Sequence, residues 1–141
     1  MIIKIKPLTP DLIDDIIQLD QRFKSPWSPE LYLERLEIFP HFALGAFNMR
    51  NKLIGFIIGK IKSNNSILVS RIVVAKRYEG KGVAKMLMNA FSEKTQLIKK
   101  ESSVRIDNIR ALMLHITTGF ILIPERNKRY DNGDLGVIFK K

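Results

Sequence analysis

A β-branched run, two closely spaced glycines and an amphipathic stretch follow one another between Ser70 and Phe91, and this order constrains the fold strongly. The run 72–74 predicts a strand, which Gly80 and Gly82 end. Apolar residues then recur at helical spacing at positions 83, 86, 87, 90 and 91. The stretch predicts a strand, a glycine turn and a helix whose first N–H groups are free to bind phosphate. A Gly-x-Gly pair alone is a weak indication, because most such pairs are ordinary turns.

The composition predicts one folded domain over residues 1–141, because 45% of the residues are hydrophobic and no long polar tract interrupts them. The chain has no cysteine, which excludes disulfides, thiol nucleophiles and cysteine-bound zinc. Its two histidines, His41 and His115, have no neighbours at ligand spacing, so no metal is expected. No apolar run approaches the ~20 residues of a membrane helix and no signal peptide is recognisable, so we expect a cytoplasmic protein without membrane contact.

The charge predicts an anionic partner of some kind. Twenty-four Lys and Arg residues stand against fourteen Asp and Glu residues, which gives a net charge of +10. Nucleic acid, an acidic membrane surface, a ribosome and a highly phosphorylated cofactor all satisfy such a surplus. Scattered lysines that only solvate the surface are the alternative, and net charge alone does not choose between them.

The remaining pattern predicts an α/β fold with about seven strands and about four helices. Antiparallel strands come first and a βαβ unit later, which indicates a mixed, mostly antiparallel sheet with helices on both faces. Strands are expected at 2–5, 42–47, 53–61, 67–74, 103–106, 120–123 and 135–139, helices at 10–22, 30–38, from 83 to at least 91 and at 108–118, and a loop at 124–133. Thr9, Ser28 and Asn108 are expected to cap helices, Gly119 to end one, and Gly55 and Gly59 to mark bulges or close approaches.

Three stretches together make nearly the whole chain resemble the GNAT acetyltransferase superfamily. Residues 74–84, VAKRYEGKGVA, are similar to the family's acetyl-CoA turn, V-x-P-x-Y-[RQ]-G-x-G-x-[GA]. Residues 104–120 match V-R-x-x-N-x-x-A-x-x-L-Y-x-x-x-G-F at nearly every fixed position. Residues 25–28, SPWS, resemble the P-W-S loop of the RimI-like branch, which acetylates the N-termini of ribosomal proteins.

The resemblance implies acetyl-CoA as cofactor and assigns it binding residues. The backbone amides of Gly80, Lys81, Gly82, Val83 and Ala84 would hold the pyrophosphate. The main chain of Ile72, Val73 and Val74 would pair with the pantetheine arm like an added strand, and Asn108 would bond the same arm. A strand splayed from its neighbour offers the unpaired N–H and C=O groups that such an arm needs.

One residue of the turn departs from the family pattern. Glu79 stands where the family has Arg or Gln, close to the expected phosphate. Its charge disfavours an anion, while the cations at positions 76, 77, 81 and 85 offset it.

The catalytic residues depart from the pattern as well. Amide formation needs a neutral amine and a proton for the departing thiolate. The family commonly supplies that proton from a tyrosine at the position of His115, and RimI-like enzymes place a glutamate base at the position of Ser103. An imidazolium is a competent acid, so His115 is a candidate; packing beside Leu114 is the alternative. Glu34 is the candidate base, with water, no base at all, or a merely solvated helix face for Glu34 as alternatives.

The resemblance also suggests substrate contacts. Tyr130 matches the second tyrosine of the branch's Y-Y pair, and Trp27, Tyr32 and Tyr130 are candidate contacts for a peptide, with a lid or packing role as the alternative for each. The chain is thus expected to transfer acetyl directly to an amine, foremost the N-terminal amine of a protein such as a ribosomal protein. Acetylation of a small amine or a lysine, and a catalytically weak protein that binds CoA or associates with RNA, remain open. Nucleic acid is not required, and the oligomeric state is not predicted.

Overall fold

The structure is a computed structural model that describes residues 2–23, 25–130 and 133–141. Within these residues the chain forms seven strands and four α-helices. They follow one another as β1 (Lys4–Pro7), α1 (Ile13–Asp20), α2 (Pro29–Ile38), β2 (Ala43–Phe47), β3 (Leu53–Ile61), β4 (Ile67–Val74), α3 (Val83–Lys94), β5 (Lys100–Arg105), α4 (Ile109–Thr117), β6 (Ile121–Arg129) and β7 (Leu135–Lys140). The predicted α/β class and the predicted order of elements are confirmed.

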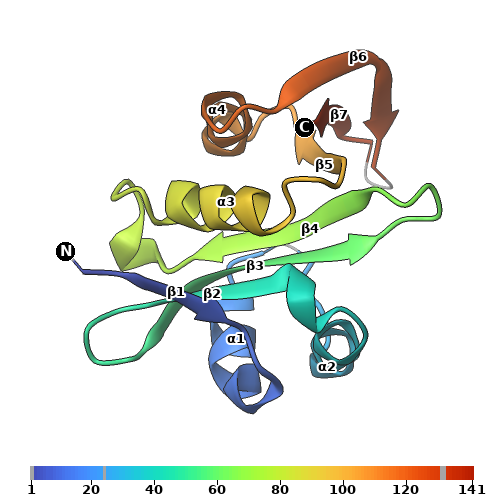
Figure 1. Cartoon of the computed structure of the whole chain (residues 1–141). Coiled ribbons are helices and arrows are strands. Elements are labelled where there is room, and N and C mark those ends of the chain that lie inside the picture. The colour runs from blue at the N-terminus through green and yellow to red at the C-terminus, as the bar shows by residue number, and fades with distance from the viewer. Residues whose placement is uncertain (1, 24, 131–132) are drawn as a thin grey trace.

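All seven strands described belong to one sheet with the order β1-β2-β3-β4-β5-β7-β6. Only the β4–β5 pair is parallel among them. Helices α1 and α2 cover one face of the sheet, and α3 and α4 lie on the other (Figure 1). No helix in the described part of the chain is long and apolar enough to span a membrane.

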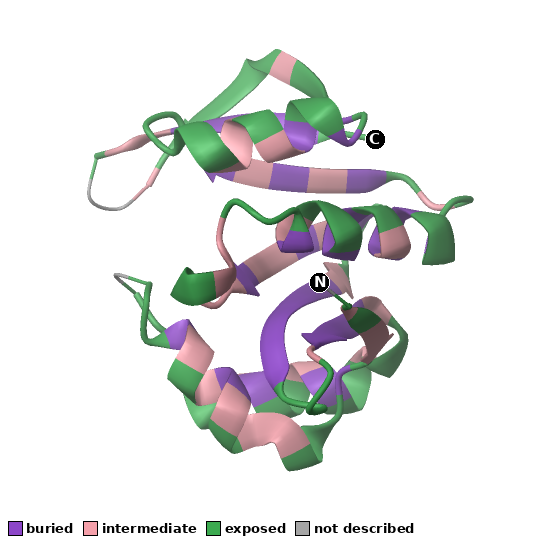
Figure 2. Cartoon of the chain, turned by 90° about the vertical axis from the view of Figure 1, so that its left-hand side faces the viewer, coloured by how far each residue is buried: buried purple, intermediate pink, exposed green. Residues whose placement is uncertain are grey.

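Each face of the sheet has its own apolar core. Ile16 of α1, Tyr32 of α2 and Phe56 of β3 are buried in the first. Leu87 and Phe91 of α3 belong to the second, larger one. Figure 2 shows the corresponding pattern, with buried positions of α3 turned toward the sheet and exposed positions turned outward. The buried positions of α3 recur at helical spacing as predicted, but Met86, expected on the apolar face, is exposed and Met88 is buried in its place.

A bulge in β4 lies where this strand separates from β5. Ile58 of β3 is opposite Arg71, while the next residue, Gly59, is opposite Val69, so Ser70 is the extra residue in β4. Such an extra residue bends the strand that carries it. β4 pairs with β5 only at Ile67 and Leu68, before the bulge, and the two strands diverge beyond it.

Two glycines of β3 allow close approaches, Gly59 to α3 and Gly55 to β4. A Cβ added at Gly59 would lie 2.8 Å from Cζ of Phe91, and one added at Gly55 would lie 2.8 Å from the carbonyl oxygen of Val73. The prediction of close approaches at both glycines is confirmed. Ser28 and Asn108 also cap their helices as predicted, by accepting from the N–H groups of Leu31 and Ala111.

The first strand lies at Lys4–Pro7 and not at 2–5, and three further local predictions are wrong. Residues 124–129, expected in a loop, extend β6 to Arg129, because the strand resumes pairing with β7 at Lys128 after an irregular stretch. Pro124 lies in that stretch, on an edge strand, where its missing N–H is tolerated. Thr9 makes no side-chain cap; its hydroxyl bonds Asp11 instead.

The third error concerns the start of β5, which begins at Lys100 and not at Ser103. The ammonium group of Lys100 donates to the carbonyls of Thr95 and Ile98, both at 2.7 Å, just beyond the end of α3. The side chain is buried, and burial lowers its pKa. Its burial is compensated because these backbone carbonyls need a donor.

Candidate active site

The divergence of β4 from β5 leaves one edge of β4 open. The N–H of Ala75 donates to the carbonyl of Ile54 at 2.8 Å, so these residues form a hydrogen-bonded pair of the antiparallel ladder. Hydrogen-bonded and non-bonded pairs alternate in such a ladder. Val74 and Ile72, opposite Gly55 and Ile57, therefore turn their N–H and C=O groups away from β3 and toward the open edge. An extended, amide-bearing ligand fits there as an added strand.

The glycine turn continues from this edge into α3. Gly80 and Gly82 have φ angles of 73° and 82°, in the left-handed region that favours glycine. A Cβ added at either position would meet nothing within 4 Å, so the space in front of both is free. The helix begins at Val83 without a side-chain cap, which leaves its first N–H groups for a ligand. These features fit a pyrophosphate, whose charge also suits the helix N-terminus.

The other predicted cofactor residues border the same region. Lys81 is exposed within the turn, and Val83 is buried, so Val83 offers only its backbone. Asn108 begins α4, and its Oδ1 accepts from the N–H of Ala111 at 3.1 Å. Its bond to the pantetheine arm stays a prediction.

Glu79 is not an isolated carboxylate. Its Oε1 accepts from Arg22, which follows α1, and its Oε2 accepts from Arg110 of α4 at 2.6 Å. The hydrogen bond from Arg22, followed by the bond from Arg110, holds the pKa of Glu79 below its usual value. No local sequence pattern marks either arginine as a partner of Glu79. The negative charge that the sequence placed in the phosphate turn is thus matched by two guanidinium groups.

His115 lies in the core and not on a surface. It is 2% exposed, and its ring stacks on Phe139 and meets Phe120 edge-on, with 5.1 Å between centroids in both cases. Its Nδ1 lies 2.7 Å from the carbonyl of Ala111 and its Nε2 lies 2.7 Å from Oγ of Ser102. Because a carbonyl only accepts, Nδ1 carries the proton, and in the neutral ring Nε2 accepts from the Ser102 hydroxyl.

This environment favours neutral imidazole, since burial lowers the pKa of His115. It fits the packing alternative, and the role of His115 as an acid stays a prediction. Ser102 directly follows the last β5 residue that pairs with β4. The hydrogen bond between Ser102 and His115 was not predicted, because nothing in the sequence around a serine in a strand indicates which residue it will contact.

Ser103 and Tyr130 meet on the opposite face of the sheet. Along β5, Ser102 faces α4, so the next side chain, Ser103, points toward the face that α1 and α2 cover. The hydroxyl of Tyr130 donates to Oγ of Ser103 at 3.1 Å. The Tyr130 ring packs on Gly136, where an added Cβ would lie only 2.7 Å from it. The structure thus brings Tyr130 to the β5 side of the open edge.

Trp27 lies on the β4 side, held by a buried ion pair. Arg71 of β4 contacts the fully buried carboxylate of Asp20 at 2.5 Å and donates to the carbonyl of Ser25 at 3.0 Å. The same carboxylate accepts from the N–H of Trp27 at 2.7 Å. The guanidinium of Arg71 also lies over the rings of Phe23 and Trp27, 4.2 and 4.5 Å from their centroids. Arg71, which the sequence did not single out, therefore shapes the turn between α1 and α2.

The remaining two candidates, Tyr32 and Glu34, belong to α2. Tyr32 is completely buried between Trp27 and Phe56, and its hydroxyl has no hydrogen-bond partner among the described residues. Burial, with Asp20 nearby, raises its pKa. Glu34 is exposed on the outer side of α2. These positions fit the packing alternative for Tyr32 and the solvated-face alternative for Glu34, and their functional roles stay predictions.

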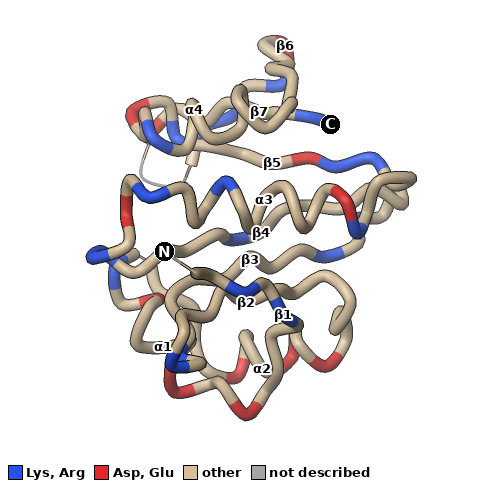
Figure 3. The backbone as a smooth tube through the Cα atoms, turned by 60° about the vertical axis from the view of Figure 1, so that its left-hand side comes forward, with Lys and Arg blue, Asp and Glu red and all other residues tan. Residues whose placement is uncertain are grey.

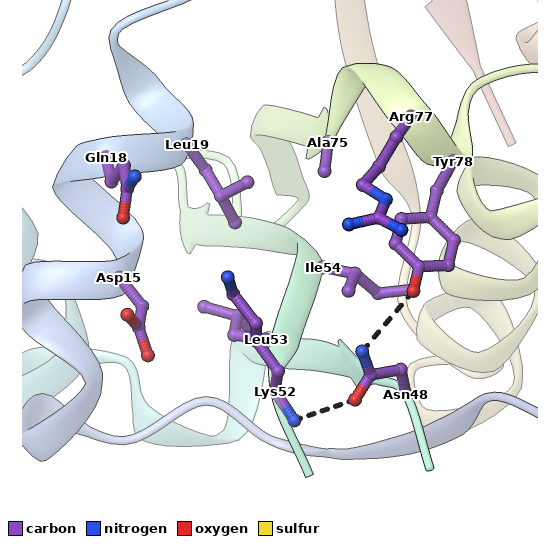
Figure 4. A pocket seen from close by; sticks show the side chains of 10 residues that line it. All are labelled: Asp15, Gln18, Leu19, Asn48, Lys52, Leu53, Ile54, Ala75, Arg77 and Tyr78. Atoms are coloured by element: carbon purple, nitrogen blue, oxygen red, sulfur yellow. Dashed lines mark hydrogen bonds between the residues drawn. The ribbon is translucent and has the colours of Figure 1, made fainter. Parts of the chain in front are cut away.

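One cavity of about 170 Å³ lies beside the glycine turn, between α1, β3 and the start of the turn (Figure 4). Asn48 donates from Nδ2 to the hydroxyl of Tyr78 at 3.3 Å across its wall. None of the residues predicted to bind cofactor or substrate lines it. The cavity therefore lies beside the turn and apart from these residues, and the open edge of β4 stays the candidate site.

The open strand edge and the uncapped helix start define a protein that holds a phosphorylated, amide-bearing ligand. The family model of the acetyltransferase (GNAT) family matches residues 13–120. The chain belongs to this family. It is an acetyltransferase, and the prediction of acetyl-CoA as its cofactor is confirmed. No curated protein sequence matches the chain.

Solved structures share the fold at low sequence identity. The NatC complex bound to Gag peptide and CoA contains a chain with a TM-score of 0.87 and 24% identity, covering 99% of this chain and 98% of that one. Ard1 from Thermoplasma volcanium has a TM-score of 0.85 and 20% identity, covering 100% and 97%. The ribosomal-protein-S18-alanine N-acetyltransferase from Escherichia coli has a TM-score of 0.76 and 16% identity, covering 99% and 92%.

Proposed function

We propose that this acetyltransferase transfers acetyl from acetyl-CoA directly to the N-terminal amine of a protein, with ribosomal proteins among the candidate acceptors. The observation that carries the proposal is the pair of aromatic residues that flank the open edge on one face of the sheet. Trp27 is fixed to β4 through Arg71, and Tyr130 is fixed to β5 through Ser103. A peptide end that enters between them reaches the divergence of the two strands from the face opposite α3.

The distribution of charge supports two separate entrances. Segment 10–38, which carries α1 and α2, holds seven acidic and three basic residues, whereas the rest of the chain holds seven acidic and twenty-one basic residues. Figure 3 shows a group of acidic positions on and around α1 and α2, while the other acidic positions are spread over the remaining elements. Such a field draws a cationic amine toward the α1–α2 face and an anionic cofactor toward the glycine turn.

Two named solved structures support the same acceptor class. One is a complex with both a peptide and CoA, and another is an enzyme that acetylates the alanine of a ribosomal protein. Acetyl-CoA supplies an activated acetyl thioester. An N-terminal amine has a pKa of roughly 7.7 to 8.0, so part of it is already neutral at physiological pH and little base catalysis is needed. Because the amine needs little help from a base, the exposed position of Glu34 is compatible with this reaction.

An acetylation assay tests the proposal. We expect CoA release when acetyl-CoA is mixed with peptides that carry a free N-terminus, and none with the same peptides blocked at the N-terminus but carrying an internal lysine. Spermidine serves as the small-amine acceptor. Transfer only to lysine or spermidine would contradict the assigned acceptor, and tight CoA binding without transfer would support a binding protein. The intact mass of the protein tests direct transfer, which predicts no acetylated form before the acceptor is added.

The two roles weighed for His115 give different results in the double variant His115→Phe with Ser102→Ala. Phenylalanine keeps the stacking on Phe139, and alanine removes the hydroxyl that would otherwise lose its partner. A proton-donating histidine predicts a fall in kcat of about a hundredfold with unchanged affinity for acetyl-CoA. The His115 ring is neutral and hydrogen-bonded at both nitrogens, which favours the other outcome, an almost unchanged kcat. Steady-state kinetics would distinguish the two outcomes.

The pH dependence of unfolding supplies an independent readout. Because burial lowers the pKa of His115, the folded chain binds its proton less readily than the unfolded chain. The resulting stability is fully present above the unfolded-state pKa of about 6.5 and is lost as the pH falls through the lower folded-state pKa. We expect Tm to fall less steeply below this pH in the double variant than in the wild type. Equal slopes would place the imidazole in contact with water.

A further inference from the structure

Glu79 ties the two helical layers together at the mouth of the open edge. Arg22 comes from the α1 side of the sheet and Arg110 from the first turn of α4 on the other side. The carboxylate between them is only partly exposed, while the side chain of Arg110 is 75% exposed. Within the described residues these two guanidinium groups share this one carboxylate, so the cluster keeps a net positive charge and unused N–H donors.

One of these arginines also occupies the open edge itself. Arg22 donates from Nη1 to the carbonyl of Val74 and from Nη2 to Glu79. Val74 is the last residue of β4, and its carbonyl turns toward the open edge by the alternation of the ladder. Arg22 therefore covers a backbone acceptor that belongs to the cofactor region, and Glu79 holds it there.

We propose that Glu79 is an internal counter-anion, which holds Arg22 and Arg110 at the mouth of the open edge in the free protein. When the cofactor binds, its pyrophosphate replaces Glu79 as the partner of both arginines. The proposal rests on the acetyl-CoA site assigned above. A guanidinium pairs with a phosphate by the same forked hydrogen bonds that it makes to a carboxylate, so the exchange preserves its bonding. The exchange also frees the carbonyl of Val74. Glu79 would otherwise only repel a phosphate. In this proposal it acts as a latch, by which we mean that it holds the two arginines in place until the pyrophosphate binds them.

Titration calorimetry with CoA tests the exchange. Glu79→Gln removes the competitor for the arginines, so we expect CoA to bind about three- to tenfold more tightly, within the range of partly exposed charge pairs. Arg110→Gln removes a phosphate partner, so we expect binding to weaken by a similar factor. In the double variant the gain from Glu79→Gln should largely disappear. Unfolding of the CoA-free protein gives a second readout, in which Glu79→Gln lowers Tm because two ion pairs are lost.

Matched controls remove the effect of net charge. Glu93→Gln deletes a negative charge near the far end of α3, and Arg50→Gln deletes an exposed positive charge in the β2–β3 turn. Both should leave the affinity for CoA nearly unchanged. Weaker binding of CoA to Glu79→Gln would show that Glu79 positions the arginines instead of competing for them, and an unchanged affinity in Arg110→Gln would also overturn the latch. If the wild type itself fails to bind CoA, the cofactor site fails first, which is a distinguishable result.

Discussion

Replacement of Gly82 by valine is expected to weaken acetyl-CoA binding by more than about a hundredfold while the protein still folds. A Cβ added at Gly82 meets nothing within 4 Å, so the fold has room for a side chain at this position. The new side chain would stand before the first N–H groups of α3. Loss of two charge-assisted hydrogen bonds, each worth about 1.5–3 kcal/mol, accounts for an effect of this size.

Gly133 offers a matched control for backbone strain. Its φ angle is 89°, close to the 82° of Gly82, and an added Cβ there also meets nothing within 4 Å. A left-handed conformation costs a non-glycine residue about 1–2 kcal/mol, so both valine variants should lose similar stability. Only Gly82→Val should lose affinity for CoA in titration calorimetry. An equal loss in Gly133→Val would attribute the effect to destabilisation and not to the phosphate site.

Replacement of Arg71 by methionine is expected to destabilise the protein by about 3–5 kcal/mol, because it leaves the buried carboxylate of Asp20 without its counter-charge. The turn that carries Trp27 should loosen at the same time, since Arg71 also bonds Ser25 and lies over the Trp27 ring. Urea denaturation measures the free energy of unfolding. Trp27 is the only tryptophan in the chain, so its fluorescence reports directly on the turn.

Two further variants separate the ion pair from the ring contact. Asp20→Asn in the Arg71→Met background removes the unpaired charge and should restore part of the lost stability. Arg35 also lies over the Trp27 ring, 5.2 Å from its centroid, but bonds no carboxylate among the described residues. Arg35→Met should therefore cost no more than about 1 kcal/mol. A loss as large as that of Arg71→Met would mean that ring contacts, not the ion pair, hold the turn.

The sequence by itself determined the order of elements, the glycine turn and the family. These features are local: β-branched runs, helical periodicity, caps such as Ser28 and Asn108, and glycines at left-handed positions all act within a few residues. The family motifs around Gly82 and Asn108 add chemistry to that local pattern. Predictions failed where a neighbour in space decided the outcome, as when β7 extended β6 beyond Pro124.

Only the tertiary structure decided how the site is assembled. Gly59, expected at a bulge or a close approach, lies opposite the bulge at Ser70. The sequence does not show that β4 and β5 diverge beyond that point. Glu79 meets Arg22 and Arg110 across 57 and 31 positions of the chain. Such pairs form only after the two helical layers have packed on their faces of the sheet. The sequence shows which side chains are charged, but packing decides which charges become neighbours. These neighbours determine whether Glu79 repels a phosphate or holds the arginines that bind one.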